Sequence, residues 1–346
     1  MAFDPATGCT GKCDHEAYRE GVRQWVRSVR RSTHAAGTEV ALFTGRARGN
    51  LASDDALART LRRGSVRVLE GDFDDSADRV AHGKPGRFVR CVMRNRWFVI
   101  RDHLRAHIHR YRSVLMTDVR DALLQADPFT WTPSAGAASP TLWTPSNEGG
   151  GDGGSSGITH DGGTHFDLRR SIVLSGEGSG SVRTLRESKK GKQRTLLCAG
   201  DASESEKRAM LATDPLNAGV TLGGAEAFLN FSSALATLIS RVTTLECLAV
   251  KDCTDQGLYN LLAYLHWERL LPHTRRVYLP VERALSYTLG HKRRCPGTDD
   301  EGRLRNGAGD LPPVVHQFAK GAVGKALRKS KAFRRRLDEL AAGGDD

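Results

Sequence analysis

The chain has 346 residues, of which 39% are apolar, and a formal charge of +12. This length allows a substantial core in one large or two small domains. No run of about 18 apolar residues occurs, which excludes an encoded membrane span and predicts a soluble protein. The seven cysteines are an odd number spread along the chain, so no disulfide framework can be read from them.

Helix and strand patterns alternate through the first third of the chain. Apolar residues at three- and four-residue spacing predict helices, and short apolar runs predict buried strands. This alternation is typical of a parallel α/β sheet. The predicted helices are 15–31, 56–61 and 96–109, and the predicted strands are 39–44, 66–69 and 114–116.

Two carboxylates, Asp118 and Asp121, follow the apolar run 114–116. Ligands of open α/β sheets bind at the carboxyl ends of the strands, and clustered carboxylate oxygens suit Mg²⁺ or Mn²⁺. We therefore take this strand end as the candidate chemical centre. The alternative is a plain turn or surface ion pair beside Arg120, since this spacing also recurs by chance.

The second half of the chain is interrupted by two segments rich in Gly, Ser and Lys. We expect 132–163 and 176–192 to be flexible insertions, because such compositions bury too little apolar surface to fold. Order is expected to return with strands at 215–224, 276–279 and 313–318 and helices at 225–238 and 255–262. We divide the chain into an N-terminal helical segment (1–37), a catalytic domain (38–325) and a basic C-terminal helix and tail (326–346).

Four short blocks occur in a fixed order along the chain. They are Thr117-Asp-Val-Arg-Asp121 with Gln125 and Asp127-Pro-Phe129, then Asn217-Ala-Gly-Val220, then Asp255-Gln256 with Asn260, and Val314-Val-His-Gln317. Together they resemble the GT-A type nucleotide-diphospho-sugar glycosyltransferases, in particular the plant, algal and bacterial group with a TDVRDxxxQxDPF block. The chain is more distantly similar to the glycogenin and galactosyltransferase group. The resemblance implies a GT-A-like, Rossmann-type α/β fold with a mixed, mainly parallel sheet flanked by helices.

The resemblance also implies a metal site for Mn²⁺ or Mg²⁺ on the donor diphosphate. Asp121 takes the place of the last carboxylate of the family's DxD motif. Asp118 is offset by one residue from the first carboxylate, so it contacts either the metal or the ribose. His316 resembles the C-terminal metal ligand, although Ala319 replaces the acid that usually follows it.

Further residues are assigned to donor binding and catalysis by the same resemblance. The implied donor-binding residues are Thr44, Arg96, Asp118, Arg120, Asn217, Ala218 and Gly219. Asp255 and Gln256 are the implied catalytic residues, where an acid orients a hydroxyl or acts as a base. Plain alternatives remain open: a strand-end turn at 217–219, a helix start at Asp255, and an interhelix salt bridge for Arg96.

The leading hypothesis is a metal-dependent glycosyltransferase with a nucleotide-diphospho-sugar donor and a glycan or protein acceptor. The alternative is a non-catalytic protein on a degenerate transferase fold that binds polyanions or glycans, which the charge of +12 favours. Nucleic acid is not the partner that we expect. The sequence leaves the compartment unknown. Because eukaryotic transferases of this kind are usually anchored in the Golgi, the alternatives are the cytosol for the chain as given, or the Golgi lumen if an anchor lies outside this sequence.

Overall fold

A computed structural model describes most of the chain. The described residues are 2–3, 15–33, 37–44, 55–70, 88–119, 122–131, 168–177, 184–187, 195–196, 198–200, 202–243, 255–279, 285–289, 298–306, 309–318, 321–327 and 329–342.

A seven-stranded mixed sheet forms the centre of the molecule, in the order β3-β2-β1-β4-β7-β6-β8. Neighbouring strands are parallel from β3 to β4 and again between β6 and β8, whereas β7 is antiparallel to both of its neighbours. This arrangement confirms the predicted mixed, mainly parallel sheet. The strands are β1 (Ala2–Phe3), β2 (Val40–Thr44), β3 (Val66–Glu70), β4 (Ser113–Asp118), β6 (Ser171–Gly176), β7 (Leu216–Gly224) and β8 (Arg275–Leu279).

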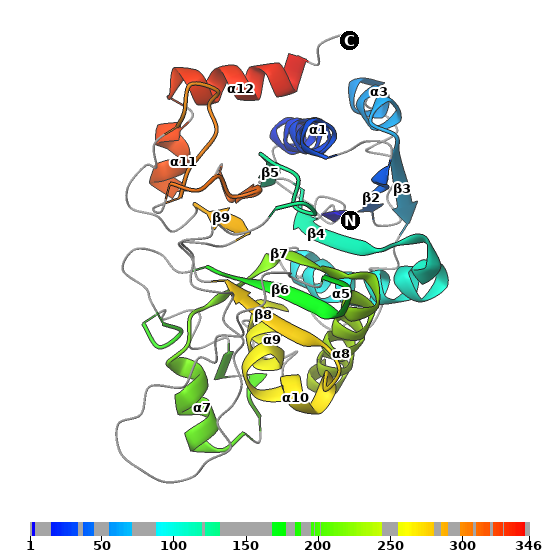
Figure 1. The fold of residues 1–346 in the computed structure, drawn as a ribbon, viewed down its shortest axis with the longest axis vertical. Helices are drawn as coiled ribbons and strands as arrows, with labels where there is room; N and C mark the ends of the chain where they lie inside the picture. The colour runs from blue at the N-terminus through cyan, green and yellow to red at the C-terminus, as the bar shows by residue number, and fades with distance from the viewer. Residues whose placement is uncertain are drawn as a thin grey trace.

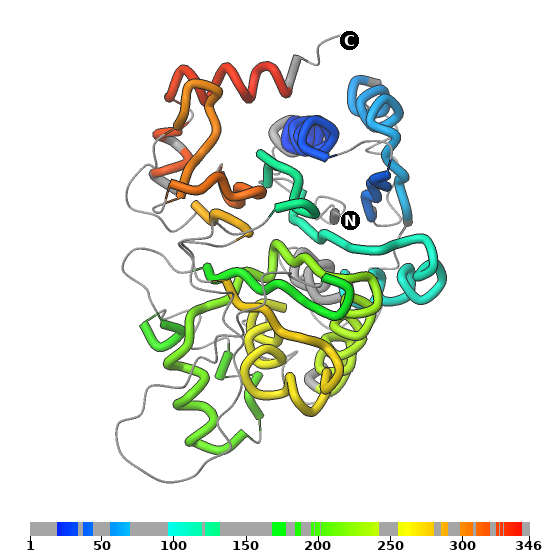
Figure 2. Tube along the Cα trace, viewed as in Figure 1, coloured from blue at the N-terminus to red at the C-terminus, as the bar shows by residue number. Residues whose placement is uncertain are grey.

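Helices cover both faces of this sheet (Figure 1 and Figure 2). One face packs against α1 and α3, and the other against α5, α8 and α9, so alternate residues of each strand enter two separate cores. In β4, Val114 and Met116 belong to one core and Leu115 to the other. The helices are α1 (His15–Ser32), α3 (Asp55–Arg63), α5 (Phe88–His107), α7 (Glu204–Leu211), α8 (Ala225–Thr243), α9 (Asp255–Leu261) and α10 (Trp267–Leu270), with a π-helical turn (Leu262–His266) between α9 and α10 and 3₁₀ turns at Ile108–Arg110 and Leu168–Arg170.

A second, three-stranded sheet lies beside the main one, in the order β5-β10-β9. Its strands are β5 (Ala122–Leu124), β9 (Ser286–Thr288) and β10 (Val314–His316). Gln125 fixes it in place, because its amide nitrogen donates to the carbonyls of Leu304 and Pro312 at 3.1 and 3.0 Å. The Gln125 amide oxygen in turn accepts from the backbone N–H of Leu304 at 2.6 Å. The residue that ends the TDVRDxxxQ block therefore anchors the segment leading to His316.

Both ends of the chain take part in the fold. Ala2–Phe3 pairs with both β2 and β4, inside the main sheet. The C-terminal segment forms two helices, α11 (Gly321–Leu327) and α12 (Lys331–Ala342), where the sequence predicted one. Arg27 and Arg31 of α1 donate to the last carbonyls of α12, those of Leu340 and Glu339, at 2.5 and 3.3 Å. These guanidinium groups satisfy carbonyls that a helix end leaves unpaired.

The predicted flexible insertion 132–163 lies outside the described residues. Of the predicted insertion 176–192, residues 176–177 and 184–187 are described. Gly176 ends β6, and Leu185 is 1% exposed. The backbone N–H groups of Leu185 and Arg186 donate to the carbonyls of Thr213 and Leu211 at 2.8 and 2.9 Å. One buried leucine and two backbone hydrogen bonds thus hold residues 184–187 against residues 211–213.

Among the described residues, no helix is both long and apolar enough to cross a bilayer.

We predict opposite outcomes for two glycine substitutions. A Cβ at Gly224 in β7 would lie 2.2 and 2.4 Å from the carbonyl oxygens of Arg169 and Leu168, whereas a Cβ at Gly37 would meet nothing within 4 Å. Gly224→Ala should therefore lower the free energy of unfolding by about 2 kcal/mol or more, because backbone must move. Gly37→Ala is the control and should change it by less than about 1 kcal/mol. Urea unfolding of both variants measures the difference, and equal stabilities would contradict the packing described at Gly224.

Candidate functional site

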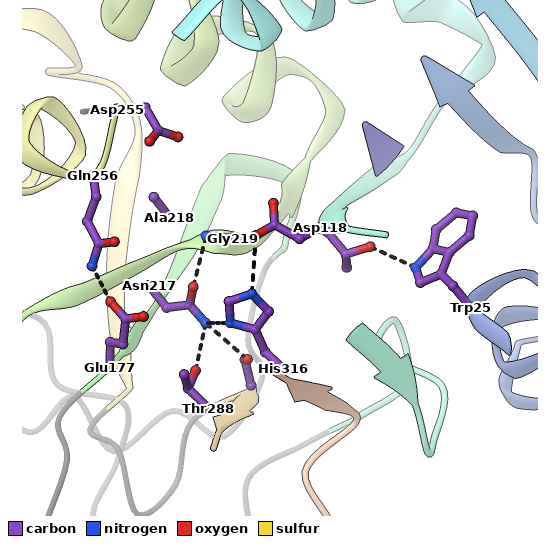
Figure 3. A network of polar contacts seen from close by, with 12 residues as sticks. Trp25, Asp118, Glu177, Asn217, Ala218, Gly219, Asp255, Gln256, Thr288 and His316 are labelled. Carbon is purple, nitrogen blue, oxygen red and sulfur yellow. Dashed lines mark hydrogen bonds and ion pairs between the residues drawn. The ribbon is translucent and has the colours of Figure 1, made fainter. Parts of the chain in front are cut away.

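The four sequence blocks meet at one edge of the main sheet (Figure 3). Asp118 ends β4, and Asn217–Gly219 open β7 at that end because β7 is antiparallel to β4. Asp255 is the first residue of α9, and His316 is the last residue of β10. Residues up to 198 positions apart in the sequence are thereby brought within hydrogen-bonding distance.

Arg96 is the centre of this cluster, and it is 2% exposed in the middle of α5. Its Nη1 donates to Asp118 Oδ1 at 2.9 Å, and its Nη2 donates to the carbonyl of Ala218 at 2.7 Å. Nη2 also donates to Asp255 Oδ2. One guanidinium therefore joins three elements of the site, namely β4, β7 and α9.

Burial and the neighbouring charges shift the pKa values of Arg96 and Asp255 in opposite directions. Burial lowers the pKa of Arg96, but the carboxylates of Asp255 and Asp118 outweigh it and leave the pKa raised. Burial raises the pKa of Asp255, and the ion pair with Arg96 opposes this shift. Because Arg96 supplies one positive charge to two carboxylates, and Asp118 keeps 22% of its side chain exposed, the cluster presents an acidic edge to solvent.

His316 is held between Asn217 and Asp118. Its Nδ1 lies 3.1 Å from Asn217 Nδ2, and its Nε2 lies 3.2 Å from Asp118 Oδ2. The Asn217 amide oxygen accepts from the N–H of Gly219 at 2.8 Å, which fixes the amide so that its NH₂ faces the imidazole. Nδ1 must then be the acceptor. The neutral imidazole consequently carries its proton on Nε2 and donates it to Asp118.

The Asn217 amide is further fixed from the small sheet. Its Nδ2 lies 3.2 Å from Ser286 Oγ and 2.9 Å from Thr288 Oγ1, both on β9. Asn217 is 1% exposed, so its polar atoms are used inside the protein. The predicted role of Asn217 and Ala218 in donor binding stays a prediction.

Gly219 lies directly beneath the contact between His316 and Asp118. A Cβ at this position would be 2.7 Å from Asp118 Oδ2 and 2.8 Å from His316 Nε2. Only a residue without a side chain leaves room for both groups.

Side chains of α9 hold the first residues of β7. Gln256 Nε2 donates to the carbonyl of Leu216 at 2.9 Å, and the N–H of Leu216 donates to Asn260 Oδ1 at 3.0 Å. The hydroxyls of Tyr259 and Thr221 lie 2.9 Å apart. Since Asp255 is 4% exposed and paired with Arg96, the start of α9 is part of the framework of the site. The catalytic role predicted for Asp255 and Gln256 is untested.

Two of the predicted residues, Arg120 and Asp121, lie outside the described residues, and Asp121 is the leading metal candidate. Thr44 is the last residue of β2 and so lies at the carboxyl end of its strand.

The sequence interpretation missed three polar residues of the site: Glu177, Ser286 and Thr288. Glu177 follows the apolar run 172–174, separated from it by Ser175 and Gly176. That pattern, an apolar run followed by an acid, is the one that identified Asp118, and it could have revealed Glu177. Ser286 and Thr288 lie on a strand of three residues, too short for its alternation to be recognised.

The described residues fit one part of a divalent-metal site. Asp118 Oδ2 and His316 Nε2 are 3.2 Å apart, close to the roughly 3 Å between two adjacent ligands that each lie about 2.1 Å from one ion. Carboxylate oxygen and imidazole nitrogen are both suitable donors for Mn²⁺. Within the described part of the chain, no three such side chains cluster, so this pair needs further ligands. Bound there, an ion would take the place of the proton on Nε2.

A cavity of about 60 Å³ lies elsewhere, between α1 and the sheet, lined among others by Trp25, Tyr111 and Phe129. Sites for drug-sized ligands usually occupy roughly 300–1,000 Å³. This cavity is therefore too small for a nucleotide sugar. Among the residues that line it, the indole N–H of Trp25 donates to Thr117 Oγ1 at 2.9 Å. This hydrogen bond joins α1 to the residue before Asp118.

Comparisons with known proteins add a distant structural likeness. No protein-family profile and no curated protein matches the chain. A crystal structure of the galactosyltransferase LgtC in complex with donor and acceptor sugar analogs is similar over 95% of this chain and 93% of that one. The TM-score is 0.46 and the sequence identity is 16%, so the likeness carries no argument about function.

We predict that Gly219→Ala leaves the fold intact but breaks the contact between Asp118 and His316. The atoms that the new methyl group meets are ends of side chains, which can move aside, so the melting temperature should fall by less than about 5 °C. In a ¹⁵N-histidine NMR spectrum, the wild type should show His316 protonated on Nε2, assigned by its loss in His316→Gln. Gly219→Ala should shift that resonance. An unchanged resonance would contradict the close approach at Gly219.

Removing the charge of Arg96 should give a pH-dependent loss of stability. In Arg96→Met, Asp255 stays buried without its cation, which should cost roughly 3–5 kcal/mol at pH 8. Below the ordinary pKa of an Asp, about 3.9, the carboxyl is neutral in both the folded and unfolded states, and the penalty disappears. Above that pH the unfolded chain ionises first, so the penalty grows until the raised pKa of the folded state is passed.

Urea unfolding at pH 5 and pH 8 measures this effect. The stability deficit of Arg96→Met relative to wild type should be smaller at pH 5. The control is the double variant Arg96→Met with Asp255→Asn, which has no buried carboxylate at 255 and should regain much of the stability at pH 8. A deficit that is the same at both pH values, and unrelieved in the double variant, would show that the ion pair is not what Arg96 contributes.

Proposed function

We propose that this protein is a metal-dependent glycosyltransferase that uses a nucleotide-diphospho-sugar donor. One observation carries the proposal: the four blocks that resemble glycosyltransferases, chosen from the sequence alone, are joined by hydrogen bonds at one sheet edge. Asp118, Asn217, Asp255 and His316 each come from a different block and belong to one network. Four residues taken at random from distant parts of the chain would not be expected to belong to one hydrogen-bonded network.

We assign Asp118 and His316 to metal binding, together with Asp121. A divalent ion held by these residues would neutralise the negative charge that develops on the leaving diphosphate. Arg96 keeps Asp118 in position through Oδ1, which leaves Oδ2 to the ion. Asn217 orients His316 from the opposite side of the ring. Hydrogen bonds to the side chains that coordinate a metal fix the orientation of those side chains.

We assign Asp255 a positioning role and Gln256 a role in contact with the sugar. Asp255 is buried against Arg96, so its carboxylate acts through that guanidinium. Gln256 is only half-buried, and the other residues of α9 are buried. The side chain of Gln256 is thus the one on this helix that a ligand at the edge can reach.

The proposal predicts Mn²⁺-dependent binding of a donor. In a thermal-shift panel of nucleoside diphosphate sugars, one donor at about 100 times its Kd should stabilise the fold by about 2.7 kcal/mol, a shift of roughly 5 °C. The shift should require Mn²⁺. Asp118→Asn should abolish it and reduce donor hydrolysis at least 100-fold, because the variant loses a charged metal ligand.

Asp102→Asn is the matched control. Asp102 lies on α5, like Arg96, but its carboxylate is 57% exposed and pairs with Arg101. This variant should behave as the wild type. If no donor gives a metal-dependent shift, and acidic glycans instead stabilise the protein in a salt-sensitive way, the protein is a polyanion binder and the proposal is wrong.

A further inference from the structure

Glu177 is a buried carboxylate at the same sheet edge that none of the roles above uses. It is the first residue after β6 and is 8% exposed. Its backbone N–H donates to the carbonyl of Pro215 at 2.6 Å, which places it beside the start of β7. A carboxylate so little exposed needs a hydrogen-bonding partner.

One such partner is the amide of Gln256. Gln256 Nε2 donates to Glu177 Oε2 and, at 2.9 Å, to the carbonyl of Leu216. Both neighbours are acceptors only, so the amide nitrogen, not the oxygen, must face them. The two N–H groups of Gln256 are thereby both engaged.

The orientation of the Gln256 amide oxygen follows from these two hydrogen bonds. With Nε2 held by Glu177 and Leu216, the Gln256 amide oxygen points away from Glu177, as Figure 3 shows. Among the described residues no group donates a hydrogen bond to this oxygen. Turning the amide by 180° would place it against a carboxylate and a carbonyl, where it is repelled.

We propose that Glu177 is a positioning residue that locks the Gln256 amide, so that the Gln256 oxygen is presented as a fixed acceptor to a hydroxyl group of the bound sugar. This inference rests on the proposed transferase function and assigns Glu177 a part in it. A preoriented, uncharged oxygen can accept a hydrogen bond from a hydroxyl without the cost of ordering a free side chain. In this role Glu177 acts through the Gln256 amide.

The hydrogen bond between Glu177 and the Gln256 amide can be tested first, without any substrate. In protein labelled with ¹⁵N-glutamine, the side-chain amide of Gln256 is identified by its loss in Gln256→Ala. Its protons should exchange slowly with solvent, and one should be shifted downfield by the carboxylate. In Glu177→Met both features should disappear. Glu226→Met, at an exposed acid in the first turn of α8, is the control and should leave them unchanged.

Kinetics on the donor found in the thermal-shift panel give the second test. Glu177→Met should lower kcat by roughly 10- to 100-fold, while the donor KM stays within about threefold, because the amide is present but no longer aimed. Glu177→Gln, whose amide oxygen can still accept from Nε2, should restore most of kcat. In the Gln256→Ala background, Glu177→Met should have little further effect, since the group it positions is gone.

The outcomes separate this inference from the proposed function. An unchanged Gln256 amide resonance in Glu177→Met overturns the lock, whatever the protein catalyses. Normal turnover by Glu177→Met, or equal losses in the Gln256→Ala background and in the wild type, overturns the positioning role while leaving the transferase assignment standing. Absence of donor binding in the wild type overturns the proposed function, and the inference with it.

Discussion

The buried guanidinium of Arg96 is the interaction on which the site depends. It is 2% exposed, and it reaches Asp118 at the end of β4, Asp255 at the start of α9 and the carbonyl of Ala218 in β7. A planar guanidinium can serve several acceptors in fixed directions, which a lysine cannot do. Two carboxylates can approach the same sheet edge only because this cation lies between them. Burying either carboxylate alone would cost several kcal/mol.

The small sheet supplies the other half of the arrangement. β10 carries His316, and β9 carries the hydroxyls that surround the Asn217 amide. β5 follows β4 closely in the chain, so the small sheet is tied to the strand that presents Asp118. Chain connectivity and three short strands thus set the distance between Asp118 and His316. Gly219 then determines how close the two groups come, since a methyl group at this position would separate them.

Much of the fold could be predicted from the sequence, because a buried helix or strand carries a characteristic pattern of apolar residues within one short segment. The strands at 39–44, 66–69 and 114–116 and the helices at 15–31 and 96–109 were all confirmed, since each buries an apolar run or stripe within one contiguous segment. β6 was missed because Gly-rich sequence follows it, and β1 because two residues carry no periodicity. Their place in the sheet is decided by partner strands distant in the sequence. The packing of Leu185 escaped prediction for the same reason.

The sequence by itself determined the alternation of helices and strands, the acids at strand ends and the four ordered blocks, because these are patterns of neighbouring residues. Only the tertiary structure decided which acid pairs with which base. It put Arg96 between Asp118 and Asp255, turned Asn217 inward to fix the proton on His316, and set Glu177 against Gln256. The physical reason is that a buried charge or amide must find its partner in three dimensions, and those partners lie 22 to 159 residues away.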